Sequence, residues 1–152
     1  MAPASILCCD TDNRRPQMKL TGGCYCGALR YEAEGEPMLK AQCHCRACQS
    51  YSGGAPNLFM VMPAAGFRYV KGTPKSFRLE DRPDRVTRDF CATCGTGVAS
   101  HRPGLPAVIL KIGTLDDPAL FKGPRAAVFA AEKQAFHIIP EGVHAFDGLP
   151  PT

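Results

Sequence analysis

The sequence lacks tryptophan, and it has no apolar run that approaches the ~18 residues a membrane-spanning helix needs. It also lacks a strong helical periodicity of apolar residues, so we expect little helix. The first residues show no positively charged segment followed by an apolar one, and we therefore expect no secretion signal. These absences argue against a membrane protein or an exported one and favour a cytoplasmic protein.

Cysteine, by contrast, is abundant, because the chain has nine and seven of them lie in three tight clusters. The spacings are C-x-C at residues 24–26, C-x-C-x2-C at residues 43–48 and C-x2-C at residues 91–94. Thiolates at such spacings are ligands that zinc selects. Many cysteines in a chain without a secretion signal also indicate a reducing compartment. The sequence therefore predicts metal binding.

The seven clustered thiolates divide unevenly between two tetrahedral zinc sites. Cys43, Cys45 and Cys48 can close around one ion within a short loop, which leaves the other two pairs to join each other. We therefore predict a structural zinc site made by four thiolates from distant parts of the chain: Cys24, Cys26, Cys91 and Cys94. The three-thiolate site keeps an open position, which is the arrangement of a catalytic zinc.

Three alternatives to this division remain. A disulfide framework is disfavoured because nine is an odd number and C-x-C pairs make strained bridges. An iron–sulfur cluster is disfavoured because C-x-C-x2-C does not match the usual ferredoxin spacings. The second zinc site could also be closed by a histidine, and the candidates are His44, His101, His137 and His144. The ring of His44, which lies between two proposed ligands, is free to point away from their ion.

Short strand patterns separated by glycine and proline turns fill the rest of the chain, which has 15 glycines and 14 prolines. Residues 46–51 favour a helical turn, and Asp116-Asp117-Pro118 resembles a helix start. The pattern predicts a mainly β, sandwich or barrel-like fold of short antiparallel strands with little helix. The expected strands are residues 18–21, 28–34, 38–42, 58–62, 67–70, 76–79, 86–90, 97–100, 107–112, 126–131 and 136–139.

The domain organisation predicted from the sequence is simple. Residues 1–17 show no periodicity and are expected to form a disordered or loosely packed tail. Cys8 and Cys9 lie in this tail, outside the clusters, and are interpreted as ordinary thiols. Residues 18–152 are expected to form a single zinc-binding β domain, since 152 residues amount to about one domain.

The order C-x-C-G, then C-x-C-x2-C, then F-C-x2-C-G-T resembles the glutathione-dependent formaldehyde-activating enzymes and the related centromere protein V group. Further stretches of the chain resemble the same family: Ser52-Gly53-Gly54-Ala55-Pro56, residues 113–118 and Asp147-Gly148-Leu149-Pro150. The resemblance covers residues 20 to 150 approximately. The cysteine pattern is its most specific part, because seven positions at three spacings rarely coincide by chance.

The resemblance implies a β-sheet fold with zinc at one side and a carbon–sulfur lyase-type activity. In the family reaction, glutathione adds to formaldehyde and gives S-hydroxymethylglutathione. An open three-thiolate zinc suits this reaction, because it can hold a thiol as the thiolate or polarise a carbonyl. Two other hypotheses remain: an enzyme of the same fold that acts on another small substrate, and a zinc-stabilised binding module without catalysis. The chain departs from the family at Ala127-Val128, where His-Ile is common, and in its lack of tryptophan.

The candidates for substrate binding are basic residues near the clusters, because glutathione carries two carboxylates. They are Arg46, Arg82, Arg85 and Arg88, and each could instead be a solvated surface charge. His137 and His144 lie in a C-terminal segment that could fold over the site, although packing is the simpler role for each. The formal charge of +4 falls to about +1 once seven thiolates and two Zn²⁺ ions are counted, so we expect no nucleic-acid partner.

Overall fold

A computed structural model describes residues 17–81 and 83–151. The tail and its Cys8 and Cys9 therefore lie outside the described residues, apart from residue 17, and so does Arg82. The strands are β1 (Met18–Gly23), β2 (Arg30–Gly35), β3 (Leu39–Cys43), β4 (Asn57–Pro63), β5 (Phe67–Lys71), β6 (Lys75–Phe77), β7 (Thr87–Phe90), β8 (Gly97–His101), β9 (Ala107–Lys111), β10 (Ala126–Val128) and β11 (His144–Ala145). The helical elements are α1 (Arg46–Tyr51) and four 3₁₀ turns, η1 (Ala64–Gly66), η2 (Ile112–Thr114), η3 (Pro118–Phe121) and η4 (Ala130–Glu132).

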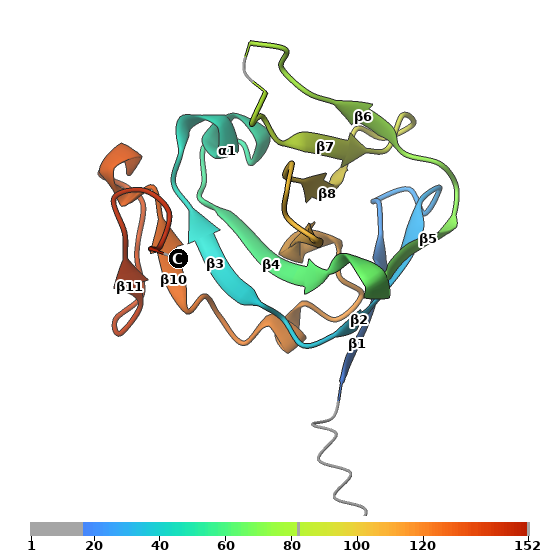
Figure 1. The fold of residues 1–152 in the computed structure, drawn as a ribbon, viewed down its shortest axis with the longest axis horizontal. Coiled ribbons are helices and arrows are strands. Elements are labelled where there is room, and N and C mark those ends of the chain that lie inside the picture. Colours follow the sequence, from blue (N-terminus) through green and yellow to red (C-terminus); the bar gives the residue numbers. More distant parts are fainter. Residues whose placement is uncertain (1–16, 82, 152) are drawn as a thin grey trace, which may run out of the picture.

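Two sheets organise the described part of the chain. The small sheet has the strand order β1-β2-β5, and the large sheet has the order β11-β10-β3-β4-β9-β8-β7-β6. In Figure 1 the large sheet curves from β11 at the left round to β6 at the top, and the small sheet lies at the right. The mainly β fold with little helix is confirmed. One part of the prediction needs correction, because β10 pairs in parallel with both β3 and β11.

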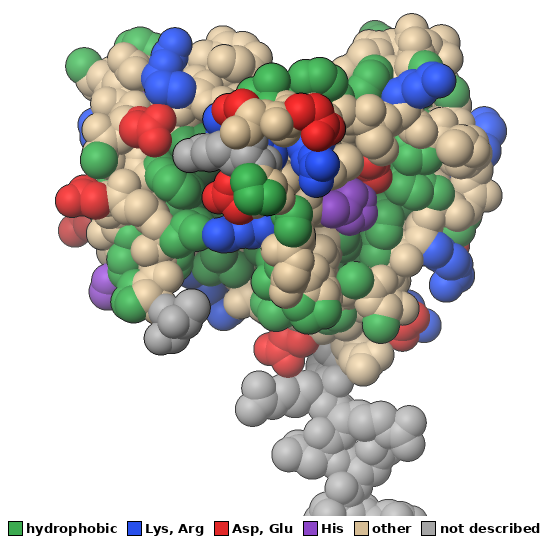
Figure 2. Space-filling view, turned by 45° about the horizontal axis from the view of Figure 1, so that its top comes forward, with side chains coloured by type: hydrophobic (Ala, Val, Ile, Leu, Met, Phe, Trp, Pro, Cys, Tyr) green, Lys and Arg blue, Asp and Glu red, His purple; other side chains and the backbone are tan. Residues whose placement is uncertain are grey.

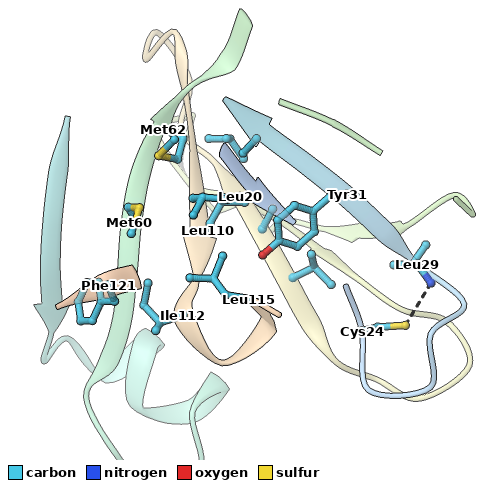
Figure 3. Close-up of a cluster of buried hydrophobic side chains, with 14 of the residues drawn as sticks. Leu20, Cys24, Leu29, Tyr31, Met60, Met62, Leu110, Ile112, Leu115 and Phe121 are labelled. Carbon is cyan, nitrogen blue, oxygen red and sulfur yellow. Dashed lines mark hydrogen bonds between the residues drawn. The ribbon is translucent and has the colours of Figure 1, made fainter. Parts of the chain in front are cut away.

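The central strand β4 shows why its sequence is a continuous apolar run. Met60 and Met62 point into a core that lies between the two sheets, together with Leu20 of β1 and Tyr31 of β2 (Figure 3). The alternate residues of β4 point to the opposite face of the large sheet, into a second cluster that includes Phe59. A strand that is covered on both faces has no side that faces solvent, so its side chains are apolar throughout. Each fully buried side chain of this size contributes about 1.5–3 kcal/mol to the stability of the fold.

Of two strands expected near the C-terminus, one is shorter than predicted and the other is absent. The strand predicted at residues 126–131 ends at Val128, because Phe129 adopts a left-handed φ of 55° and η4 follows. Residues 136–139 form no strand, although their exposure alternates as a strand's would: Phe136 is 72% exposed, His137 5% and Ile138 80%. This alternation arises because His137 is turned inward from a turn, where its amide donates to the carbonyl of Gln134 at 3.0 Å.

Other local expectations are met. The helical turn at residues 46–51 is α1, and the proposed helix start is η3, where the Asp117 carboxylate accepts a hydrogen bond from the amide of Ala119 at 3.1 Å. In the part of the chain that the structure describes, no helix has the length and apolar character needed to cross a bilayer.

Candidate metal centres and the pocket between them

The structure brings Cys24, Cys26, Cys91 and Cys94 together, with all four Sγ atoms within 4.8 Å of one another. The Cys24–Cys26 and Cys26–Cys91 sulfur separations are 3.6 and 3.8 Å. The first pair lies in the turn between β1 and β2, and the second lies between β7 and β8. The two pairs therefore come together as the sequence predicted, and the structure adds that they join a turn of the small sheet to a turn of the large one.

Glycines form the turns that present these four thiols. Gly27 and Gly95 follow the two pairs with φ values of 74° and 75°, a left-handed conformation that favours glycine. Their amides donate to the carbonyls of Cys24 and Cys91, at 3.1 and 2.9 Å respectively. Each turn thereby folds its two sulfurs to one side. The C-x-C-G and C-x2-C-G patterns thus encode the local geometry as well as the ligands.

Hydrogen bonds to sulfur favour the thiolate at Cys24 and Cys94 in this group. The Thr96 hydroxyl lies 3.1 Å from the Sγ of Cys94, and it accepts a bond from the amide of Tyr25 at 3.2 Å. A thiolate at Cys94 can only accept, so the hydroxyl donates to it, and this bond, together with bonds from the backbone of Thr96 and Cys26, lowers the pKa of Cys94 to about 5. The amide of Leu29 donates to the Sγ of Cys24 at 3.1 Å. Thiolates held in this way are ready to bind a metal.

The three-cysteine group consists of Cys43, Cys45 and Cys48, whose Sγ atoms also lie within 4.8 Å of one another. Cys43 ends β3, Cys45 is the N-cap of α1, and Cys48 lies in the first turn of that helix. The Sγ of Cys45 accepts a bond from the amide of Cys48 at 3.4 Å. Hydrogen bonds from Cys43 and Cys48 lower the pKa of the Cys45 thiol below its usual value.

No histidine joins either group among the described residues, so the geometry gives no support to the closed second site. All seven of these cysteines are free thiols, which argues against a disulfide framework. The ring of His44 points away from the three sulfurs and contacts His137 instead, at an Nδ1–Nδ1 distance of 3.0 Å. His144 is exposed in β11. Within the described residues the three-cysteine group therefore offers three ligand atoms, which leaves the fourth position of a tetrahedral zinc to another ligand.

A pocket of about 920 Å³ lies near both cysteine groups, although none of the seven cysteines lines it. One wall is formed by Tyr51 and Ser52, at the end of the helix that carries Cys48, and another by Gly95 and Thr96, which follow Cys94. The space is large enough for a tripeptide-sized ligand, since ligand pockets typically measure about 300–1,000 Å³. The pocket is thus the place where a substrate could approach the three-cysteine group.

Two cations line this pocket. The guanidinium carbon of Arg88 lies 4.3 Å from the centre of the Tyr51 ring, and the Lys111 ammonium donates to the Asn57 side chain at 2.8 Å. Burial lowers the pKa of Lys111, and the neighbouring Cys48 thiolate acts in the opposite direction. Sequence analysis missed Lys111. The available signal was a single lysine within the otherwise apolar strand pattern at residues 107–112.

The other candidate arginines have different surroundings. Arg46 bonds the side chain of Gln49, and Arg85 forms a two-pronged pair with Asp81 at 2.6 and 2.8 Å. Neither lines the pocket, whereas Arg88 does. Of the three candidates within the described residues, Arg88 is therefore the one placed to meet a ligand.

His101 belongs to a hydrogen-bond network around Asp89, which is buried and also lines the pocket. The Asp89 carboxylate accepts bonds from Tyr69 at 3.0 Å, Ser76 at 2.7 Å and His101 Nε2 at 2.8 Å. The bond to Asp89 raises the pKa of His101 above its usual value. A raised folded-state pKa means that the pair stabilises the fold below pH ~6.5 and that this stabilisation is lost as pH rises past the folded value.

We therefore expect His101→Asn to destabilise the protein more at pH 6 than at pH 9. The difference should be on the order of 0.5 kcal/mol, because the His101 side chain is 42% exposed and solvent screens the pair. Urea unfolding of the zinc-loaded protein at the two pH values measures it. His144→Asn, at an exposed histidine, is the control for general effects of pH. An equal loss for His101→Asn at both pH values would contradict the prediction.

Three comparisons with known proteins bear on the family and the fold of this chain. A family model described as "Glutathione-dependent formaldehyde-activating enzyme" matches residues 19–132. A protein of Halomonas elongata, provisionally named as a glutathione-dependent formaldehyde-activating enzyme, is 25% identical over 112 residues, which are 70% of this chain and 71% of that protein. A crystal structure of a Rhodobacter sphaeroides protein superposes with a TM-score of 0.52 at 21% identity, covering 63% of this chain and 87% of the other. The last comparison shows a shared fold.

Proposed function

The chain belongs to the glutathione-dependent formaldehyde-activating enzyme family, and on that premise we propose that it is a zinc-dependent carbon–sulfur lyase-type enzyme. Its proposed reaction joins glutathione and formaldehyde to S-hydroxymethylglutathione, or runs in reverse. The observation that carries this proposal is the three-cysteine group, which has no fourth protein ligand among the described residues and lies beside a pocket lined by Arg88 and Lys111.

The sulfur geometry supports zinc as the metal and two ions per chain. Zinc–sulfur bonds of ~2.3 Å give tetrahedral sulfur–sulfur edges of about 3.8 Å. The separations of 3.6 and 3.8 Å at Cys24–Cys26 and Cys26–Cys91 fit such a tetrahedron. The donor set is all thiol, which suits zinc and excludes the hard cations that need oxygen ligands. We propose the four-cysteine group as the structural site and the three-cysteine group as the catalytic one.

When bound at the three-cysteine group, zinc supplies an electrophilic centre that favours the thiolate form of a thiol substrate. Arg88 and Lys111 can bind the two carboxylates of glutathione and orient its cysteine toward that group. The thiolate sulfur then attacks the formaldehyde carbon, a carbon–sulfur bond forms, and the carbonyl electron pair moves to the oxygen, which takes up the proton that the thiol released. Most of the increase in rate comes from holding the two reactants close together, since the addition already proceeds without a catalyst.

The free thiols and the surface charges indicate the cellular compartment and the partners of the protein. Seven free thiols support a reducing compartment, and we propose the cytoplasm. On the described part of the face drawn in Figure 2, basic and acidic side chains are interspersed, so that face offers no continuous basic surface for nucleic acid. We further propose that residues 18–152 act as one zinc-binding domain. Its partners would be small molecules, glutathione and formaldehyde.

The proposal is tested by the rate of S-hydroxymethylglutathione formation near equilibrium, followed by NMR exchange spectroscopy. The wild type should exceed the spontaneous rate, and a wild type that does not would rule out the formaldehyde reaction for this chain. Screening other thiols and aldehydes would then separate an enzyme with another substrate from a module without catalysis.

Removal of a pocket cation should weaken glutathione binding. We expect Arg88→Gln and Lys111→Gln each to raise the KM for glutathione about 10–100-fold, because a hydrogen bond to a charged group contributes about 1.5–3 kcal/mol. The kcat should change less. Arg68→Gln is the matched control, since Arg68 lies in β5 of the small sheet and pairs with Glu32 on the surface. Unchanged KM values in both pocket variants would contradict the assignment of the carboxylate sites.

A further inference from the structure

The C-terminal segment of residues 128–138 lies over the loop that carries the three-cysteine group. The carboxylate of Glu132 accepts a bond from the amide of Arg46 at 2.7 Å, and its carbonyl accepts one from the Gln49 side chain at 3.0 Å. The amide of His44 donates to the carbonyl of Val128 at 3.0 Å. The loop is thus held from behind by a segment that is distant in sequence.

Two buried histidines form the centre of this contact. His44 is 0% exposed and His137 is 5% exposed. Their Nδ1 atoms lie 3.0 Å apart, so one of them must carry the hydrogen and the other must accept it. The hydrogen-bond partners at the two ends of the pair decide which Nδ1 donates and which accepts.

The end at His44 is fixed by Gln42. The side-chain nitrogen of Gln42 donates to the carbonyl of Ile138 at 3.2 Å, and a carbonyl can only accept, so this atom is the amide nitrogen. The same nitrogen lies 3.2 Å from the Nε2 of His44. The Nε2 of His44 must therefore accept, which places the hydrogen of a neutral His44 ring on Nδ1.

The end at His137 is fixed by two backbone groups. The amide of Gln134 donates to the Nδ1 of His137 at 3.3 Å, so this atom accepts. The Nε2 of His137 lies 2.8 Å from the carbonyl of Gly54, to which it can only donate. Both ends therefore require the same direction along one chain: Gln42 donates to His44, His44 donates to His137, and His137 donates to Gly54.

We propose that His44 and His137 are positioning residues, a neutral pair in opposite tautomers that fixes the direction of the thiols of Cys43 and Cys45. His44 stands between these two cysteines, so anchoring its ring from behind restricts the backbone on both sides. The chain of bonds ends at Gly54, next to Ala55 and Pro56 in the pocket wall. The role of the histidine pair in catalysis rests on the proposed function. The assignment of its tautomers rests only on the hydrogen bonds.

The tautomers can be read directly by ¹⁵N NMR of the zinc-loaded protein labelled at histidine. The chain has four histidines, so the spectrum is simple, and His44→Asn and His137→Asn assign the two signals. We expect the hydrogen of His44 on Nδ1 and that of His137 on Nε2. The same tautomer at both positions, or a doubly protonated ring at either, would overturn the proposal whatever the protein catalyses.

A matched pair of variants tests the positioning role by metal release to a chromogenic chelator. His44→Asn keeps an amide group where Nδ1 lies, whereas His44→Gln reaches toward the Nε2 position and loses the bond to His137. We expect zinc release from the three-cysteine group to be about 10-fold faster in His44→Gln and close to wild type in His44→Asn. Zinc release from the three-cysteine group is identified as the kinetic phase that is absent in Cys45→Ser. His144→Asn, at an exposed histidine, is the control. Equal rates in all four proteins would overturn the positioning role.

Discussion

Cys91→Ser is expected to lower the thermal unfolding midpoint by more than about 10 °C and to remove one zinc ion per chain. A structural zinc contributes on the order of 10 kcal/mol in small domains, which is comparable to the whole stability of many proteins. Even half of that loss would shift the midpoint by about 10–20 °C at this chain length. Metal analysis and thermal unfolding of the reduced protein measure both effects.

The structure gives the reason for so large an effect. Cys91 is buried, and with Cys24 it belongs to the core that lies between the two sheets. Its loss would therefore free the β1–β2 turn from the β7–β8 turn and leave unpaired thiols in the core. Thr93→Ser, an exposed position in the same turn, is the control. A Cys91→Ser midpoint within a few degrees of wild type would show that the four-cysteine group is not structural.

The cysteine groups could be predicted because ligand spacing is local and its chemistry is restrictive. Three thiols within six residues can bind one ion without contacts from the rest of the fold. The two remaining pairs must then share the second site. The turns were equally local, since Gly27 and Gly95 mark them in the sequence. The mainly β fold followed from short alternating segments and their glycine and proline boundaries.

The parts that sequence analysis missed all depend on contacts between distant segments. Lys111 reaches the pocket because β9 pairs with β4, where Phe59 lies opposite it, and no local pattern indicates that pairing. The sequence placed His137 in a segment that could fold over the site, but it predicted a strand there and gave no sign that the ring meets His44. The parallel pairing of β10 with β3 brings this segment over the cysteine loop, and two short strands carry too little periodicity to predict it.

Cys45→Ser is expected to reduce turnover to the spontaneous rate while the thermal midpoint stays within a few degrees of wild type. The zinc content should fall by one ion per chain, because two thiolates and a weakly bound hydroxyl do not hold the metal. The assay is the exchange measurement described above, always compared with the uncatalysed reaction. Ser50→Ala, on an exposed position of the same helix, is the control for general changes in α1.

The fold should survive this substitution for two structural reasons. Cys45 is the N-cap of α1 and accepts a bond from the amide of Cys48, and serine is among the residues that cap helices best. The loop is also held without metal, since Glu132 and His137 bond it from the C-terminal segment. A drop in stability as large as that expected for Cys91→Ser would mean that both groups are structural. Turnover at the wild-type rate would place the chemistry elsewhere in the pocket.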